Sequence, residues 1–141
     1  MIKIAIYEPY SGLLRGNKLL LSCYDDFQVV LADTDKYQLL ETLKDTQVDV
    51  FLFSYKSRET DNNTYLDELK ILIPTLKIIG FSSYIDKDFS ISAIERNVRS
   101  LLLKSEDAPI IETTIREVHQ KGYSFNNQFK EEYLIEFLSQ N

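Results

Sequence analysis

The feature that most constrains the fold is a short run, residues 50–53, that reads Val-Phe-Leu-Phe and is apolar at every position. A strand with one wet face alternates apolar and polar residues, so an unbroken apolar run indicates a strand covered by helices on both faces. Such strands lie in the middle of parallel sheets. Ser54 follows this run, at the strand end where ligand sites lie in open α/β sheets. The sequence therefore predicts a central parallel strand with a candidate site that begins at Ser54.

Strand-like and helix-like segments alternate along the rest of the chain. Runs of β-forming residues predict strands over residues 2–7, 27–32, 50–53, 76–81 and 101–103. Apolar residues at helical spacing predict two helices capped by Ser11 and by Thr34 or Asp35, and further helices that begin near Tyr65, Asp86 and Pro109. A strand–helix unit repeated five times implies an α/β fold with one five-stranded parallel sheet, doubly wound by helices on both faces.

Two residues are predicted to end helices. Asn97 lies near the end of the fourth helix, where the backbone often turns left-handed and Asn is the best substitute for Gly. Gly122 ends the fifth helix. We expect residues 1–122 to form the domain and residues 123–141 to form a linker and an amphipathic C-terminal helix. The apolar stripe of that helix, with its aromatic residues exposed for contact, consists of Phe129, Tyr133, Leu134, Phe137 and Leu138.

Composition narrows the functional classes. A formal net charge of −6, without a basic stripe, argues against a nucleic-acid surface on this domain. Cys23 is the single cysteine, so no internal disulfide can form, and we expect it on the buried side of the first helix. No apolar run reaches the length of a membrane span. The apolar segment at residues 1–6 is too short and too β-like for the apolar region of a signal peptide. We expect a cytoplasmic protein with no membrane contact.

Four polar residues stand where predicted strands end: Glu8, Ser54, Ser82 and Lys104. The carboxyl ends of parallel strands meet at one edge of the sheet, so these side chains should lie near one another. Loops at that edge tolerate almost any polar residue, and each position alone is weak support for a site. Together they make this edge the candidate site.

Several segments resemble the receiver domains of two-component response regulators, specifically the LuxR/NarL-type branch that carries helix-turn-helix output domains. The resemblance covers roughly residues 2–126. It implies a flavodoxin-like receiver fold and a role in signal transduction and transcription regulation. The segments that carry it are Ile2–Ile6 with Leu19–Leu21, Val48–Val50, Leu102–Ser105, Ile115–Val118 and Gly122–Ser124.

The same resemblance implies a degenerate phosphorylation site. In the family two adjacent acids bind Mg²⁺, an Asp accepts the phosphoryl group, and a hydroxyl, a lysine and an aromatic residue respond to it. The matching positions here are Glu8 and Pro9, Ser54, Ser82, Lys104 and Leu101. One metal ligand, the phosphoacceptor and the switch aromatic are thus replaced. Ser57-Arg58-Glu59 also replaces the usual loop after the phosphoacceptor.

These replacements should weaken both metal binding and phosphoryl transfer. Mg²⁺ prefers hard oxygen ligands that include carboxylates, and Glu8 alone would hold it poorly, so we expect no metal and no other cofactor. A serine hydroxyl is a poor nucleophile without an activating base or metal. We expect no such group near Ser54, because the single His119 falls near the end of the fifth helix. The chain is therefore not expected to be an enzyme.

A structural role for the same residues is the working hypothesis. Lys104 would pair with Glu8 across the sheet edge, with Ser54 and Ser82 hydrogen-bonding around the pair, because opposite charges in a partly buried cleft stabilise each other. The alternative is that these side chains are simply hydrated.

Three functions remain open at this point. The first is a phosphorylation-independent receiver-like module that acts through protein partners, including a second copy of the chain, with DNA reached only through a separate output domain. The second is an assembly domain with no regulated state. The third is a flavodoxin-like binder of a small ligand, which the chain disfavours because its four glycines form no phosphate-cradling loop.

Overall fold

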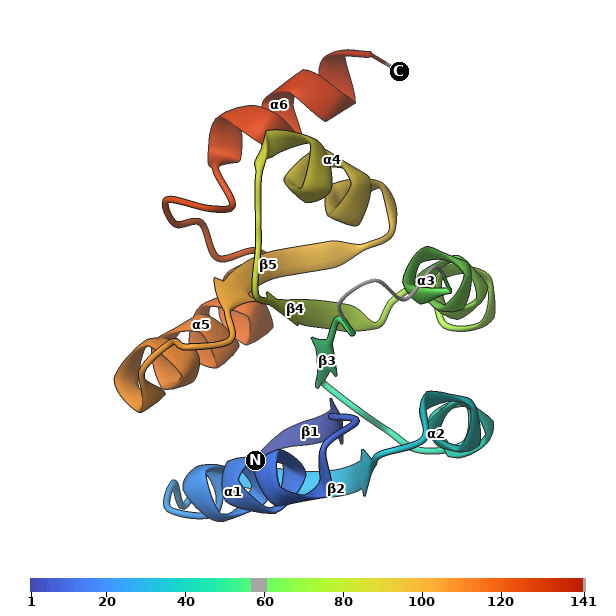
Figure 1. Ribbon diagram of the computed structural model, residues 1–141, viewed down its shortest axis with the longest axis vertical. Coiled ribbons are helices and arrows are strands. Elements are labelled where there is room, and N and C mark those ends of the chain that lie inside the picture. The colour runs from blue at the N-terminus through green and yellow to red at the C-terminus, as the bar shows by residue number, and fades with distance from the viewer. Residues whose placement is uncertain (57–60, 141) are drawn as a thin grey trace.

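The computed structural model describes residues 1–56 and 61–140, and within them the chain forms a single parallel sheet flanked by helices (Figure 1). The strand order is β2-β1-β3-β4-β5. The strands are β1 (Ile2–Tyr7), β2 (Phe27–Asp33), β3 (Val50–Ser54), β4 (Lys77–Ser82) and β5 (Val98–Leu103). The helices are α1 (Ser11–Leu21), α2 (Lys36–Leu43), α3 (Asn62–Leu72), α4 (Lys87–Glu95), α5 (Ala108–Lys121) and α6 (Glu131–Ser139). The predicted doubly wound α/β architecture is confirmed.

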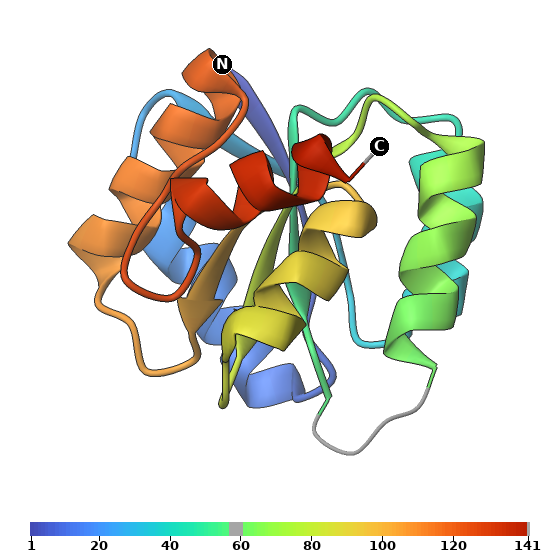
Figure 2. The same cartoon turned by 90° about the horizontal axis from the view of Figure 1, so that it is seen from above.

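The central strand β3 is buried on both faces, as its sequence predicts. Val50 and Leu52 belong to a core with residues of α1 and α5, whereas Phe51 and Phe53 belong to a second core beneath α2, α3 and α4. Figure 2 shows these two helical layers on opposite sides of the sheet. Burying a side chain the size of Phe or Leu contributes roughly 1.5–3 kcal/mol, so this short strand supplies much of the packing energy.

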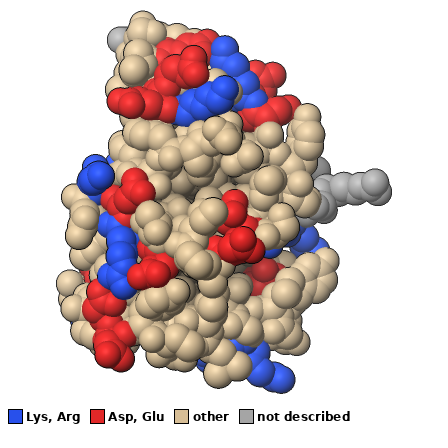
Figure 3. Space-filling model, turned by 90° about the vertical axis from the view of Figure 1, so that its left-hand side faces the viewer, with Lys and Arg blue, Asp and Glu red and all other residues tan. Residues whose placement is uncertain are grey.

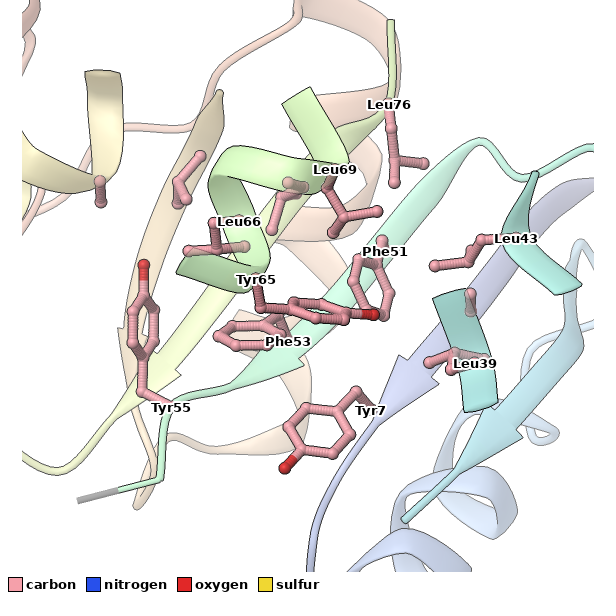
Figure 4. Close-up of a cluster of buried hydrophobic side chains, with 14 of the residues drawn as sticks. Tyr7, Leu39, Leu43, Phe51, Phe53, Tyr55, Tyr65, Leu66, Leu69 and Leu76 are labelled. Atoms are coloured by element: carbon pink, nitrogen blue, oxygen red, sulfur yellow. The ribbon is translucent and has the colours of Figure 1, made fainter. Parts of the chain in front are cut away.

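Aromatic rings dominate the core beneath α2, α3 and α4 (Figure 4). The Phe53 ring stacks on Tyr65 of α3, with centroids 5.6 Å apart and planes 12° apart. Tyr7 of β1 lies on another side of Phe53, at 5.3 Å between centroids. Tyr55, just after β3, meets the Phe53 ring edge-on at 5.0 Å. The strand that ends at Ser54 is therefore clamped on this face by tyrosines.

Several predicted helix boundaries are confirmed at atomic detail. Asp35 caps α2 by accepting from the backbone N–H groups of Tyr37 and Gln38, over 3.0 and 3.2 Å. Asp86 caps α4 by accepting from the N–H of Phe89 over 2.8 Å. Asn97 has a positive φ of 67° and Gly122 one of 89°, as expected for left-handed residues after helices.

Several expectations about individual residues or bounds are wrong. Ser11 is the first residue of α1 and not its cap, since Tyr10 precedes the helix without a side-chain capping bond. Strand β5 begins at Val98, three residues before Leu101, because Val98 pairs with Ile78 directly after the Asn97 turn. Helix α3 begins at Asn62 instead of Tyr65.

Cys23 was also misplaced, because it is exposed and lies just beyond the end of α1. Its thiol lies 3.5 Å from the carbonyl oxygen of Leu19, within the turn that links the helix to β2. The core position at this end of α1 is filled by Leu21.

The C-terminal segment packs back on the domain. Helix α6 lies across α4 (Figure 2), and Lys87 of α4 and Glu136 of α6 form an ion pair at 3.0 Å. Phe129, expected on the exposed stripe, instead precedes α6 and is fully buried in the aromatic core. The Oγ of Ser90 in α4 donates to the carbonyl of Gln128 over 2.7 Å, which holds Phe129 in place. Leu138, which belongs to the same apolar stripe, is exposed.

Within the described residues, every helix falls short of the length and apolar character that crossing a membrane requires.

Candidate functional site

The parallel sheet brings the carboxyl ends of its strands to one edge. Glu8 follows β1, Ser54 ends β3, Ser82 ends β4 and Lys104 follows β5. Strands β1 and β3 are neighbours, with Tyr7 opposite Phe53, so Glu8 and Ser54 project side by side. The predicted gathering of these residues at one edge is therefore what the strand order produces.

Glu8 is the buried centre of this edge, with 4% of its surface exposed. Its Oε1 accepts a hydrogen bond from Ser54 Oγ over 3.0 Å, and its Oε2 accepts from the Tyr10 backbone N–H over 3.0 Å. Pro9 lies between Glu8 and Tyr10 and carries no N–H to donate. Both partners are neutral donors, which meet the demand that a buried polar group be hydrogen-bonded. They do not neutralise the charge.

The expected ion pair between Lys104 and Glu8 is not among those formed by residues 1–56 and 61–140, and Lys104 is exposed. The strand order explains the difference. Strands β3 and β4 separate β1 from β5, which puts their ends about 14 Å apart at a strand spacing of about 4.8 Å. Both side chains would have to extend fully toward each other to bridge that gap, whereas the Glu8 oxygens are turned to Ser54 and to the Tyr10 N–H. Only the contact between Glu8 and Ser54 in the hypothesis is present.

Ser82 does not join Glu8 and Ser54. Its Oγ donates to the carbonyl of Tyr84 over 2.9 Å, within the loop that leads to α4. Adjacent residues of a strand face opposite sides of the sheet, and Phe81 is the one that shares a cavity with Glu8 and Ser54. The Lys104 backbone N–H reaches the Ser82 carbonyl over 3.1 Å, so the ends of β4 and β5 are joined through main-chain atoms.

The contact of Ser54 with Glu8 was expected, but the chemical role that it allows Glu8 was not. The single histidine does lie away from this edge, since its carbonyl accepts from the Nζ of Lys77 at the start of β4, over 3.2 Å. The carboxylate of Glu8, however, is in the position of a base that could take the Ser54 proton. The pairing of β1 with β3 was the signal that could have revealed it, because that pairing sets the two residues at the same height.

The donor set at this edge does not fit Mg²⁺. Glu8 is its buried carboxylate, and each of its oxygens already accepts a hydrogen bond. Pro9 and Ser54 occupy the positions where the resemblance would require further acids. Among the residues described, no three His, Cys, Asp or Glu side chains come together as a metal site would require. The replaced loop at Ser57-Arg58-Glu59 lies outside the described residues.

The resemblance places an aromatic residue at the position of Leu101 in β5. The ring that lies beside Leu101 belongs instead to Tyr55, which follows β3. Leu101 is fully buried, and its side chain borders the Tyr55 ring across Gly80. Tyr55 also meets Phe89 of α4, at 4.8 Å between ring centroids. Burial raises the pKa of the Tyr55 hydroxyl above its ordinary value, so the ring stays neutral. Tyr55 thus fills the space between β4, β5 and α4.

A buried lysine lies in the adjacent core. Lys36, on the first turn of α2, is 5% exposed and forms an ion pair with Asp61 at 2.8 Å. Asp61 also accepts from the Tyr37 hydroxyl over 3.0 Å. The ammonium lies 5.8 Å from the ring centroid of Tyr7 and 5.9 Å from that of Tyr65, within the range of cation–π attraction. Sequence reasoning missed this cluster because its members are far apart along the chain and none has a motif.

A cavity of about 170 Å³ opens beside Glu8 and Ser54, between the sheet, α1 and the start of α5. Its polar residues, besides those two, are Asn17, Lys104 and Glu106. The rest of the wall is apolar, with Ile6 and Leu52 of the sheet among its members. The cavity was not predicted, since it arises from how α1 and α5 diverge above the sheet.

Figure 3 shows one face of the molecule, on which Lys and Arg lie intermingled with Asp and Glu. Basic side chains form no stripe on that face. This mixed pattern and the net charge of −6 both speak against phosphate-backbone recognition by this face.

No protein-family model matches the chain. Two curated proteins resemble it at low identity along almost its whole length. The uncharacterized transcriptional regulatory protein YhcZ of Bacillus subtilis is 23% identical over 140 residues, which cover 99% of this chain and 64% of the relative. The response regulator protein VraR of Staphylococcus saprophyticus is 24% identical over 134 residues, which cover 95% of this chain and 62% of the relative. The chain thus spans a little less than two thirds of each.

Solved structures share the fold. A LuxR-family two-component response regulator from Aurantimonas matches with a TM-score of 0.78 and 14% identity, over 98% of this chain and 96% of that one. The order of elements, the parallel sheet and this overlap lead to one conclusion: the chain has the fold of a response-regulator receiver domain.

Proposed function

We propose that the chain is an atypical receiver domain of a response regulator, which acts in signal transduction and transcription regulation through protein contacts and without phosphorylation. The observation that carries this proposal is the contact between Ser54 and Glu8. Where the resemblance places a phosphoacceptor carboxylate, the chain has a hydroxyl hydrogen-bonded to a buried carboxylate.

Electrostatics supports this reading. Although Glu8 could accept the Ser54 proton, a phosphoryl group on Ser54 would bring ≈ −1.5 to −2 charges at neutral pH next to Glu8. At about 4 Å and an effective dielectric constant of about 20, each pair of like charges costs about 4 kcal/mol. A bound Mg²⁺ would offset that repulsion, but the donor set does not fit the ion.

Incubation with acetyl phosphate and Mg²⁺, followed by intact-mass spectrometry, tests the proposal. We expect no mass change, while a receiver domain with the usual acids, treated in parallel, gains one phosphoryl group. Because a phosphoserine survives acid and an acyl phosphate does not, the spectra should be recorded under neutral and acidic conditions. A stable adduct on Ser54 would contradict the proposal.

A second candidate is an assembly domain with no regulated state. The outer face of α6 favours it, because Ile135 and Leu138 are each 59% exposed there. Sedimentation over a range of concentrations tests for association of the chain with itself. If Ile135→Ser with Leu138→Ser abolishes an association that the parent chain shows, the outer face of α6 is the contact.

We further propose that any contact with DNA is made by another part of the gene product. The names of the relatives, a transcriptional regulatory protein and a response regulator, support a link to transcription. The charge of this domain does not provide a DNA surface. Determining whether the reading frame continues past Asn141 into a helix-turn-helix segment tests this proposal directly.

A further inference from the structure

The cavity beside Glu8 joins an apolar wall to one buried carboxylate. Ile6 and Leu52 rise from the sheet, Leu20 and Leu21 come from α1, and Ile111 comes from α5. At about 170 Å³ it is close to the roughly 150 Å³ cavity that is known to hold a benzene molecule in a protein interior. The size and the wall therefore suit a ligand with one small apolar group.

The carboxylate sets the charge of the ligand. An ionised carboxyl group has about four acceptor sites, and Glu8 uses two of them for neutral donors. Among the ion pairs of the described residues, none involves Glu8, so its buried charge has no cationic partner there. A cation in the cavity would form a charge-assisted hydrogen bond, which is roughly twice as strong as a neutral one.

The other charged groups of the cavity point to the same class. Lys104 and Glu106 both line the cavity, and Lys104 is exposed. An anionic ligand would meet two carboxylates for one ammonium. A bare metal ion would meet a mostly apolar wall, which offers few of the oxygen ligands that hard cations require.

We propose that this cavity binds a small organic cation, a primary ammonium carrying one aromatic ring or an alkyl group of similar size, with its nitrogen on Glu8. The apolar group would lie against Leu52 and Ile111. The site goes beyond the proposed function and does not depend on it, because Glu8 would bind the cation whether or not Ser54 can be phosphorylated.

Calorimetric titration of the whole chain with three matched probes tests the proposal. Benzylamine carries the ammonium at neutral pH, benzyl alcohol is its neutral analogue, and benzoate is the anionic one. We expect benzylamine to bind at least about 10-fold more tightly than benzyl alcohol, as the loss of a charged hydrogen bond implies, and benzoate to bind least. Equal affinities for the three, or no binding of benzylamine at millimolar concentration, would overturn the proposal.

Variants locate the site. Glu8→Gln keeps an acceptor for Ser54 but removes the charge, and it should weaken benzylamine about 10-fold or more. Glu132→Gln is the matched control, because Glu132 is exposed on the first turn of α6 and does not line the cavity, and it should change the affinity by less than about threefold. Ala108→Leu, on the partly exposed first turn of α5, should fill the cavity and abolish binding while leaving the melting temperature near that of the parent. Undiminished binding in Glu8→Gln or Ala108→Leu would contradict the assignment.

Discussion

Gly80 lies in the middle of β4, and the space a side chain would need there is filled by Tyr55 and Leu101. An added Cβ would lie 2.7 Å from Tyr55 Cε1 and 2.8 Å from Leu101 Cδ2. Both neighbours are buried and packed on further residues, so neither can move away without disturbing the core. Gly80→Ala is therefore an overpacking substitution, which costs typically about 1–3 kcal/mol.

An opposing effect has to be subtracted. Ala restricts the unfolded chain more than Gly does, which stabilises a protein by about 0.4–1 kcal/mol where the native backbone tolerates it. The φ angle of Gly80 is not in the left-handed region, so this gain applies in full. The middles of these two ranges leave a net loss for Gly80→Ala of roughly 1.3 kcal/mol in the free energy of unfolding, or a melting temperature lower by about 3–5 °C.

Gly16→Ala is the matched control. Gly16 lies inside α1 with nothing within 4 Å of an added Cβ, so Ala should stabilise the protein by up to about 1 kcal/mol. Urea unfolding followed by circular dichroism measures both variants. Shifts of opposite sign are the expected result. If Gly80→Ala were neutral or stabilising, the tight packing of Tyr55 against β4 would be refuted.

Three further predictions concern charge and backbone. Lys36→Met keeps the aliphatic stem but removes the ammonium that pairs with Asp61, and it should lower the free energy of unfolding by about 1–3 kcal/mol. Lys44→Met, at an exposed ion pair, should change that free energy by less than about 0.5 kcal/mol. Equal effects of the two variants in urea unfolding would contradict the buried pairing. The hydrogen bond from Arg116 lowers the pKa of Asp26, so the stabilisation from this pair is present above the ordinary Asp pKa and is lost as the pH falls through the lowered pKa. The Arg116→Ala variant should therefore lose less stability than the parent between pH 5 and pH 3. An unchanged pH dependence of stability would argue against this pairing. Asn97→Ala should lower the free energy of unfolding by about 1–2 kcal/mol, measured by thermal unfolding, because φ is positive at this residue. Asn97→Gly should be close to neutral. Similar losses in both variants would show that the backbone angle is not the cause.

Local pattern was sufficient to predict most of the fold. The apolar run at 50–53 gave a strand buried on both faces, and Asp35, Asp86 and Gly122 marked helix ends through chemistry that acts within a few residues. Cys23 was misplaced because helical spacing alone did not show that α1 had already ended at Leu21.

The site was harder to predict because it depends on strand order. The contact of Glu8 with Ser54, which was expected, requires β1 beside β3, whereas the expected pair of Glu8 with Lys104 would have to cross two further strands. Tyr55 follows β3 and lies beside Leu101 of β5 across the intervening β4, a contact that no single-strand pattern reveals. Apart from the contact of Glu8 with Ser54, contacts between distant segments were thus the part beyond sequence reasoning.

The central claim is that the edge beyond β3 no longer supports phosphoryl transfer, and the Ser54→Asp variant tests it most directly. This change supplies the missing carboxylate but leaves Pro9 without the second acid that a metal site would need. Intact-mass spectrometry after treatment with acetyl phosphate and Mg²⁺ should find the parent chain and Ser54→Asp both unmodified. A phosphoryl adduct on the parent chain, or on Ser54→Asp alone, would contradict the account.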